Sequence, residues 1–405
     1  MKTIEQKAKN VPAIRFAGFD DEWEKMSFAD VGNVCMCKRV FKEETSDKGD
    51  IPFYKIGTFG GIPDAYITKE LYNEYRTKFS YPEKGDILLS AAGTIGRIVE
   101  YDGECAYFQD SNIVWLSHDK SITNKFLKVL YPTLKWGGIE GSTIQRLYND
   151  IFLKTSFFKP TISEQQKIGS FFSNIDSLIS LEQKKYDKLT QVKKSMLEKM
   201  FPKEGTAVPE IRFTGFKGDW ERKRIGDIAD IIGGGTPSTS ISEYWDGDID
   251  WYAPAEINNQ IYVECSVRKI TKMGLDNCSA RILPANRTIL FTSRAGIGKT
   301  AILRHPGATN QGFQSLVLKD DVNPYFIFSM SSFIKEKAER IASGSTFAEI
   351  SGKMLADIEI LIPKNLEQQK IGSYFSHLDS LISLQQHKLE KLKNIKKSLL
   401  EKMFV

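Results

Sequence analysis

One segment of the chain occurs twice, and it constrains the fold more than any other feature. Residues 164–201 read EQQKIGSFFSNIDSLISLEQKKYDKLTQVKKSMLEKMF, and residues 367–404 read EQQKIGSYFSHLDSLISLQQHKLEKLKNIKKSLLEKMF. The two align over 38 residues without a gap, with 27 identities. Neither copy contains Gly or Pro after Gly169 and Gly372. Because Gly and Pro are the weakest helix formers, both segments are predicted to be long, uninterrupted helices.

Apolar residues in both copies recur at alternating spacings of four and three. A seam kept for about five heptads is typical of helices that supercoil around a partner, whereas a helix that packs only on its own domain rarely keeps one seam so long. We therefore predict that the two copies pair. A pseudo-two-fold relation between the repeats makes the pair antiparallel, with Glu182 near Lys396, two of the four polar residues that interrupt the seams. The predicted helix-pair interface consists of Ile168, Phe172, Ile175, Ile179, Leu189, Met196, Ile371, Phe375, Leu378, Ile382, Leu392 and Leu399.

The duplication extends beyond the helices. VPAIRFAGFDDEW at 11–23 matches VPEIRFTGFKGDW at 208–220, and weaker matches join Gln109 to Gln311 and GST at 141–143 to GST at 344–346. Short β-rich runs between turn residues alternate with helical stretches, which predicts two mixed α/β blocks. The second helix ends where a linker would lead back to residue 11, so these two points are expected to lie close together.

The predicted fold is therefore α+β: two mixed α/β domains related by a pseudo-two-fold axis and separated by two long antiparallel coiled-coil helices. The predicted segments are the first domain at 1–162, its helix at 163–201, a linker at 202–207, the second domain at 208–365 and its helix at 366–405.

Composition excludes several classes of protein. The 405 residues are 41% hydrophobic and 26% charged, with a net charge of +5, which permits nucleic-acid binding without requiring it. No apolar run is long enough to cross a membrane, and the first ten residues lack the apolar core of a signal peptide, so a cytoplasmic protein is expected. Five Cys and four scattered His residues show no metal-ligand spacing, and no metal site is predicted.

The chain resembles the specificity subunit of type I restriction-modification systems. The resemblance rests on the EQQKIGSFFSNIDSLI and EQQKIGSYFSHLDSLI starts of the helices, their KKSMLEKMF and KKSLLEKMF ends, and GGTPST at 234–239 followed by YW and GDIDWY. The counterpart of GGTPST in the first block, at 36–41, reads MCKRVF.

This resemblance implies a non-catalytic subunit that binds double-stranded DNA. Each block would be a target-recognition domain that reads one half of a gapped sequence, and the helices would be a spacer on which two methyltransferase subunits dock. Restriction subunits, which act as endonuclease and translocase, would complete the complex. S-adenosylmethionine, ATP and Mg would be used by those partners, and this chain would bind no cofactor.

Glycine turns and the loops after them supply the candidate DNA contacts. Arg97 and Lys299 follow matched turns, GTIGR and AGIGK, where a cation and backbone amides suit a DNA phosphate. Neighbouring amide, hydroxyl and guanidinium side chains are the groups that read base edges. The predicted DNA-binding residues are Thr94, Arg97, Gln109, Ser111, Asn112, Arg146, Arg294, Lys299, Asn310, Gln311 and Gln314.

Two other motifs suggest alternative functions. AGIGKT at 295–300 resembles a phosphate-binding P-loop of an NTPase, but Ser293 stands where the first Gly of that motif belongs. NPYF at 323–326 resembles an amino-methyltransferase motif but is better interpreted as the start of a helix. A coiled-coil scaffold without DNA affinity is the remaining alternative.

Overall fold

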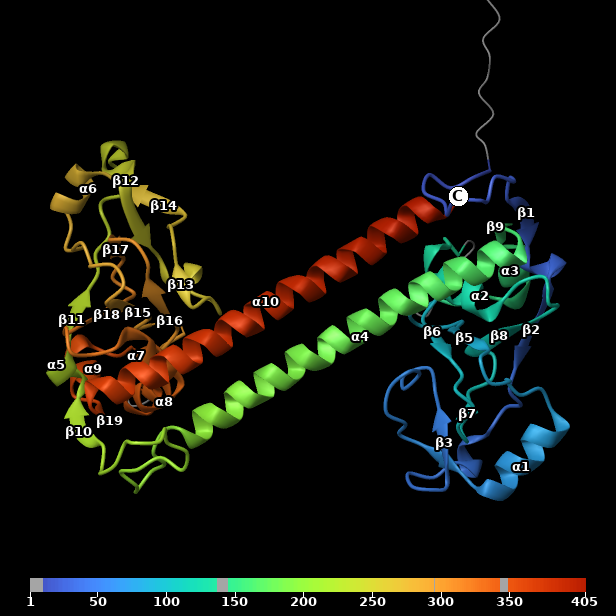
Figure 1. Cartoon of the computed structure of the whole chain (residues 1–405), viewed down its shortest axis with the longest axis horizontal. Coiled ribbons are helices and arrows are strands. Elements are labelled where there is room, and N and C mark those ends of the chain that lie inside the picture. The colour runs from blue at the N-terminus through green and yellow to red at the C-terminus, as the bar shows by residue number, and fades with distance from the viewer. Residues whose placement is uncertain (1–9, 137–144, 295, 343–348) are drawn as a thin grey trace, which may run out of the picture. The chain divides into compact units, whose positions relative to one another are not determined.

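The computed structural model describes residues 10–136, 145–294, 296–342 and 349–405. The chain forms two compact units (Figure 1). Unit 1 combines the residues up to Gln183 with His387–Val405, and unit 2 consists of Lys184–Gln386. The GST repeats at 141–143 and 344–346 lie outside the described residues.

Both duplicated segments are long helices, as predicted. They are α4 (Ile162–Lys199) and α10 (Asn365–Met403). In unit 1, Asp176 pairs with Lys396 and Glu182 with Lys388, so the α4 residue number rises as the α10 number falls. The two helix segments of this unit therefore run antiparallel.

The body of unit 1 is built from short strands in three sheets. The strands are β1 (Glu24–Ser27), β2 (Gly32–Met36), β3 (Ile51–Tyr54), β4 (Tyr66–Ile67), β5 (Ile87–Ser90), β6 (Ile98–Glu100), β7 (Tyr107–Phe108), β8 (Ile113–His118) and β9 (Ser156–Lys159). One sheet is antiparallel in the order β2-β8-β5-β6, a second has the order β4-β3-β7 with β3 and β7 parallel, and β1 pairs with β9. All four residues of the inner strand β5, sequence ILLS, are buried.

Unit 2 repeats this plan. Its strands are β10 (Glu221–Arg224), β11 (Ala229–Gly233), β12 (Trp245–Tyr252), β13 (Tyr262–Val263), β14 (Arg268–Ile270), β15 (Thr288–Phe291), β16 (Thr300–Leu303), β17 (Gly307–Thr309), β18 (Gln314–Leu318) and β19 (Glu359–Ile362). The sheet orders are β11-β18-β15-β16-β13, β14-β12-β17 and β10-β19. Each sheet of unit 2 therefore has the strand order of a sheet in unit 1, except that β13 adds an edge strand beside β16.

Several of the shorter helices begin at a side chain that caps their first turn. Thr123 accepts a hydrogen bond from the Phe126 amide at the start of one of them, and Asn323 accepts one from Phe326 at the start of another. NPYF is therefore a helix start, as predicted. These helices are α1 (Lys69–Lys78), α2 (Asn124–Leu130), α3 (Asn149–Lys154), α5 (Ile225–Ile228), α6 (Lys272–Asp276), α7 (Pro324–Ser329), α8 (Ser331–Ala342) and α9 (Gly352–Ala356).

Each unit contains the start of one long helix and the end of the other. Phe172 of α4 and Met403 of α10 share the core of unit 1, and Phe375 of α10 shares the core of unit 2 with Met200. The Ile14 amide donates to the Lys402 carbonyl at 2.9 Å, so residue 14 and the end of α10 lie close together, as expected. No helix among the described residues is long and apolar enough to span a membrane.

Candidate nucleic-acid interface

The glycine turn of unit 1 connects β5 to β6, and a serine hydroxyl makes hydrogen bonds across it. The Ser90 Oγ donates to the Thr94 carbonyl at 2.5 Å and accepts from the Arg97 amide at 2.9 Å. Gly96 has a φ of +85°, a conformation that favours glycine. Thr94 is exposed at this turn.

Unit 2 builds the same turn between β15 and β16. The Thr292 Oγ1 donates to the Gly296 carbonyl at 2.6 Å and accepts from the Lys299 amide at 3.0 Å. Lys299 therefore occupies the position of Arg97, as the sequence match implies. A P-loop joins a strand to a helix, whereas this turn joins two antiparallel strands, which argues against the P-loop interpretation of AGIGKT.

The two matched cations differ in their surroundings. Arg97 donates from Nη1 to the Phe59 carbonyl at 2.9 Å, so its guanidinium also anchors a neighbouring loop. Lys299 is exposed, and its Nζ has no hydrogen-bond or ion-pair partner in the described part of the chain. Of the two, Lys299 is the freer to neutralise a phosphate.

Three predicted residues of unit 1 lie together. Arg146 donates from Nη2 to the Ser111 Oγ at 2.8 Å and to the Asn112 Oδ1 at 3.0 Å. Gln109 belongs to the same region, but its Oε1 accepts from the Ile56 amide at 2.8 Å, which holds this side chain against the backbone. The arrangement offers a guanidinium, a hydroxyl and an amide at one surface.

A corresponding group forms in unit 2. Arg294 donates from Nη2 to the Gln311 carbonyl at 2.9 Å, and its Nε lies 3.6 Å from the Glu349 carboxylate. The Asn310 Oδ1 accepts from the Gly312 amide at 2.8 Å. Gln314 is half-buried beside Gly233, and Asn310 is half-buried too, whereas Arg294 and Gln311 are exposed.

The strand register corrects the match between Gln109 and Gln311. The Gln109 amide donates to the Tyr54 carbonyl at the end of β3, and the Asn310 amide donates to the Tyr252 carbonyl at the end of β12. Gln109 therefore corresponds to Asn310. Further along, the Ala91 amide donates to the Asn112 carbonyl and the Ser293 amide to the Gly312 carbonyl, so Asp110 and Ser111 together stand opposite Gln311. The sequence match aligned the two glutamines because they are the same residue type, whereas the pairing of β3 with β7 is visible only in the fold.

Sequence reasoning did not select Arg39, Asp110 or Thr236. Arg39 approaches Asp110 with its Nε at 3.2 Å from the Oδ2. Thr236 donates a short hydrogen bond from its Oγ1 to the Gln311 Oε1. The sequence signal was the match of MCKRVF to GGTPST. That match is one residue out of register, because Met36 at the end of β2 corresponds to Gly233 at the end of β11.

The GGTPST loop needs its glycines for packing. A Cβ on Gly234 would lie 2.0 Å from the Asn310 carbonyl oxygen, and one on Gly235 would lie 2.5 Å from the Ala280 amide nitrogen. Gly234 therefore lies against the segment that carries Gln311, and Gly235 lies against residues 279–280. In unit 1 the buried Cys37 lies in the matching loop, and burial raises the pKa of its thiol to about 12. Among the described residues no cluster of three or more His, Cys, Asp or Glu is placed to hold a metal ion.

The predicted seam residues differ in burial along the helices. Those at the start of each helix are buried in the cores, whereas the later ones are half-buried. The buried group is Ile168, Phe172, Ile175, Ile371, Phe375 and Leu378, and the half-buried group is Ile179, Leu189, Met196, Ile382, Leu392 and Leu399.

The predicted pairing of Glu182 with Lys396 is wrong. Lys396 pairs with Asp176, and Glu182, which is 4% exposed, pairs with Lys388. In unit 2 the repeat partner of Lys396, Lys193, pairs with Asp379. The long lysine side chains reach past the seam to carboxylates beside it, so the two polar seam positions do not need each other.

The start of each long helix is anchored in the same way. Glu164, fully buried, accepts from Arg15 at 2.7 and 2.8 Å, and Glu367 accepts from Arg212 at two distances of 2.7 Å. Gly169 lies against α2, where a Cβ would come 2.6 Å from the Lys125 Cβ. The identical EQQKIGS sequences are thus explained by a common joint between helix and domain.

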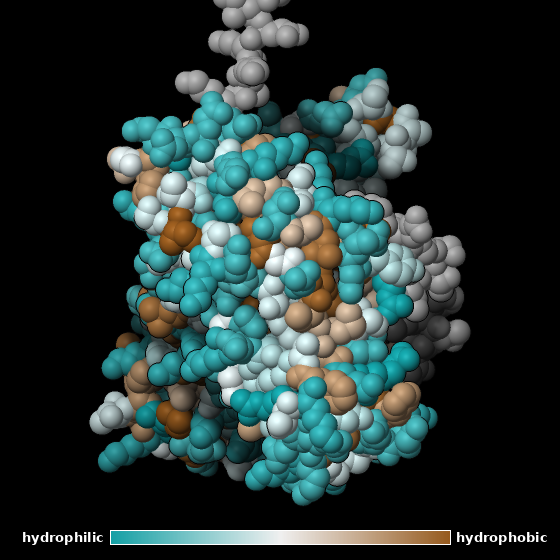
Figure 2. Space-filling view, turned by 90° about the vertical axis from the view of Figure 1, so that its right-hand side faces the viewer, coloured by the Kyte–Doolittle hydropathy of each residue, from teal (hydrophilic) through white to brown (hydrophobic). Residues whose placement is uncertain are grey.

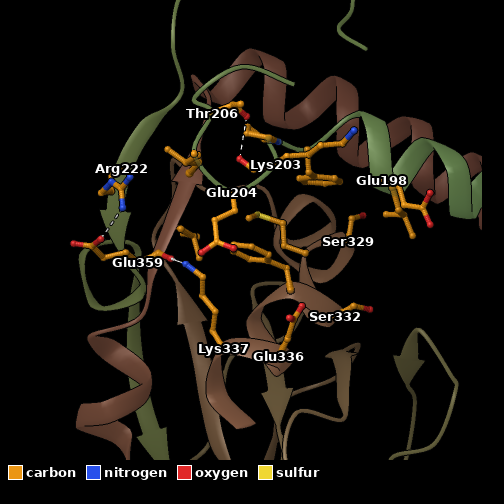
Figure 3. A pocket seen from close by; sticks show the side chains of 18 of the residues that line it. Glu198, Lys203, Glu204, Thr206, Arg222, Ser329, Ser332, Glu336, Lys337 and Glu359 are labelled. Carbon is orange, nitrogen blue, oxygen red and sulfur yellow. Dashed lines mark hydrogen bonds and ion pairs between the residues drawn. The ribbon is translucent and has the colours of Figure 1, made fainter. Parts of the chain in front are cut away.

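A pocket of about 610 Å³ lies at the end of α4 in unit 2 (Figure 3). Leu197 and Phe201 line it, and their repeat partners Leu400 and Phe404 line a pocket of about 690 Å³ in unit 1. Figure 3 places Glu359 between Arg222 and Lys337; Arg222 donates to its carboxylate at 3.0 Å and Lys337 to its carbonyl at 2.8 Å. Arg222 and Glu359 thus form an ion pair at the pocket, and Lys337 bonds to a backbone carbonyl.

Comparison with known proteins places these features in a family. The family model described as "Type I restriction modification DNA specificity domain" matches residues 20–191 and 217–394. A putative type I restriction enzyme specificity subunit of Haemophilus influenzae is 55% identical over 160 residues, 39% of this chain and 42% of the relative. The MjaIX specificity subunit of Methanocaldococcus jannaschii is 42% identical over 195 residues, 46% of this chain and 44% of the relative. The chain thus matches less than half the length of either relative.

A solved structure extends the likeness to the whole fold. The S subunit of a type I restriction-modification system from M. genitalium has a TM-score of 0.65 at 14% identity, covering 98% of this chain and 99% of that one. The family model covers both units, and the fold agrees over almost the full length. The chain therefore belongs to the family of type I restriction-modification DNA specificity proteins.

Proposed function

We propose that the chain is the DNA-recognition subunit of a type I restriction-modification complex, in which each unit reads one half of a bipartite, gapped target. It has no reaction of its own in this proposal. S-adenosylmethionine, ATP and Mg serve the methyltransferase and restriction subunits, and the complex works in the cytoplasm. Family membership and the likeness to specificity subunits support the assignment.

The observation that carries this proposal is one framework bearing two sets of polar side chains. The turns at Ser90 and Thr292 make the same hydrogen bonds, yet Arg97 in one unit corresponds to Lys299 in the other. Around them, unit 1 groups Arg146 with a serine and an asparagine, whereas unit 2 groups Arg294 with a glutamine and a glutamate. Two unlike readers on one framework suit an asymmetric DNA target.

Exchange of one unit's recognition block tests the proposal. Residues 11–162 are replaced by the matching block of a relative with another target, and the methylated sites of the complex are mapped by sequencing. We expect one half of the motif to change and the other half and the gap to persist, because the two units read independently. A change in both halves contradicts independent reading, and unchanged methylation by the partners without this chain refutes the assignment.

The long helices carry an exposed apolar stripe in both units. In unit 1 it consists of Leu178 and Leu181, which are 48% and 49% exposed. In unit 2 it consists of the repeat partners Leu381 and Leu384, which are 52% and 67% exposed. On the face shown in Figure 2, hydrophobic residues gather only in small patches among hydrophilic ones.

These stripes are the proposed docking surfaces for two methyltransferase subunits, one for each unit. A surface that is the same in both units suits a partner present in two identical copies, whereas DNA half-sites differ. Leucines exposed on a helix at a spacing of three are the usual anchors for a partner helix. The stripes therefore support docking of the same partner on both units, whereas the different loops support reading of different DNA half-sites.

Charged substitutions test the docking surfaces. In the variant Leu178→Glu with Leu181→Glu, we expect the number of bound methyltransferase subunits to fall from two to one. Two leucines lose at least about 3 kcal/mol of burial between them, roughly a hundredfold in affinity. Native mass spectrometry of the complex measures the copy number. The matched variant Leu381→Glu with Leu384→Glu removes the other copy, and Ser180→Glu on the exposed side of α4 retains both. Two bound copies in every variant would place the docking surface elsewhere.

A further inference from the structure

A pair of contacting side chains lies at a similar place in each unit, and the pair in unit 1 differs in chemistry from the pair in unit 2. Arg39 follows the last residue of β2 by three positions, and Thr236 follows the last residue of β11 by three. Their partners Asp110 and Gln311 each follow directly after the equivalent residues Gln109 and Asn310. One pair is thus a cation with a carboxylate, and the other is a hydroxyl with an amide.

The geometry of Arg39 leaves its reading edge free. Asp110 approaches the Nε of Arg39 at 3.2 Å, and the arginine side chain is 64% exposed although Asp110 is only 19% exposed. The terminal nitrogens of Arg39 have no hydrogen-bond partner among the described residues. A guanidinium fixed through Nε keeps both terminal nitrogens for a bidentate contact, and guanine offers the matching acceptors O6 and N7.

The geometry of Gln311 is the counterpart. Its Oε1 accepts from Thr236, and its backbone carbonyl accepts from Arg294 at 2.9 Å. The side chain is exposed. An amide oxygen has two lone pairs, so Gln311 can still accept a second hydrogen bond while its Nε2 donates. An adenine presents the matching N6 donor and N7 acceptor.

We propose that this pair of positions sets one base in each half-site: Arg39, positioned by Asp110, reads a guanine in the half bound by unit 1, and Gln311, positioned by Thr236, reads an adenine in the half bound by unit 2. The proposal rests on the proposed DNA recognition and names the residues that decide one position of each half. Asp110 and Thr236 act as positioning residues that orient the reading side chain.

The test compares base preference at every position of the mapped target. Binding of the complex to duplexes with each single base-pair change is measured for the wild type, Arg39→Ala, Arg39→Lys and Gln311→Ala. With Arg39→Ala we expect discrimination at one guanine of the unit 1 half-site to fall about 5- to 150-fold, with the other positions unchanged. Arg39→Lys keeps the charge but loses the fork, so discrimination at the same guanine also falls.

Two controls separate the possible failures. Lys38→Ala removes the neighbouring exposed cation, and we expect it to relax no base position. Asp110→Asn weakens the orientation of Arg39, and we expect partial relaxation at the same guanine. Absence of any sequence-specific binding by the wild-type complex would refute the proposed function itself. Specific binding whose base preferences stay unchanged in Arg39→Ala, or change in the half-site of unit 2, would overturn this inference alone.

Discussion

Replacing Glu164 with alanine is expected to destabilise unit 1 by about 3–5 kcal/mol, the usual cost of leaving one partner of a buried ion pair alone. Glu164 is fully buried and accepts from two nitrogens of Arg15 and, at 3.2 Å, from the Trp23 Nε1. The hydrogen bond to Glu164 is also the main cause of the raised pKa of Arg15. Without the carboxylate, a guanidinium that is 13% exposed and a buried indole N–H lose their acceptor.

The duplication supplies a matched variant for this experiment. Arg212 donates to Glu367 but also to the carbonyls of Gly218 and Lys217, and the Trp220 Nε1 has no partner in the described structure. Glu367→Ala is therefore expected to cost unit 2 less than Glu164→Ala costs unit 1.

Hydrogen exchange resolved by mass spectrometry reports on each unit separately. We expect Glu164→Ala to lower the protection of backbone amides in α2 of unit 1, and to leave the protection of α7 in unit 2 nearly unchanged. The control Asp150→Ala removes an exposed pair with Lys154 and should cost under about 1 kcal/mol. Equal effects of Glu164→Ala and Asp150→Ala would mean that the buried pair does not secure this joint.

Replacing Gly169 with leucine should destabilise unit 1 by about 3 kcal/mol, at the upper end of the cost of overpacking a core. A Cβ at this position would come 2.9 Å from the backbone carbonyl carbon of Lys125, so α2 itself would have to move. The gain in helix propensity on removing a glycine, about 1 kcal/mol, is too small to offset this. Denaturant unfolding followed by hydrogen exchange in α2 measures the effect.

Ser180→Leu is the matched control for the glycine substitution. It introduces the same side chain at an exposed position of α4, where nothing has to shift, and should change the unfolding free energy by under about 0.5 kcal/mol. If Gly169→Leu behaves like Ser180→Leu, then the close approach of α2 and α4 does not require glycine.

The helices were predictable because their evidence is local and repeated. A 3.5-residue period identifies a seam without any knowledge of the rest of the chain. The error over Glu182 and Lys396 arose because the seam fixes which side of a helix faces its partner but leaves the axial register open. Asp176, one position off the seam, takes Lys396 instead.

The candidate site was harder to predict because its contacts join distant segments. The equivalence of Arg97 and Lys299 followed from matched turns, but the bond from Arg97 to the Phe59 carbonyl depends on where another loop lies. The pairing of Arg39 with Asp110 likewise depends on how β2 pairs with β8, because Arg39 follows β2 and Asp110 lies between β7 and β8. Sequence could place these residues near loops, whereas only the fold could bring them together.

The common joint of Glu164 and Glu367 has a consequence for how new specificities arise. In both units an arginine on the domain pairs with a buried carboxylate near the start of the long helix, and a helix glycine packs closely on the domain. Recombination with its breakpoint in the duplicated segments would replace a whole domain and keep these contacts between domain and helix. If each unit reads one half-site, as proposed, such an exchange gives a new target in one recombination event, whereas stepwise substitution would have to preserve folding at every intermediate.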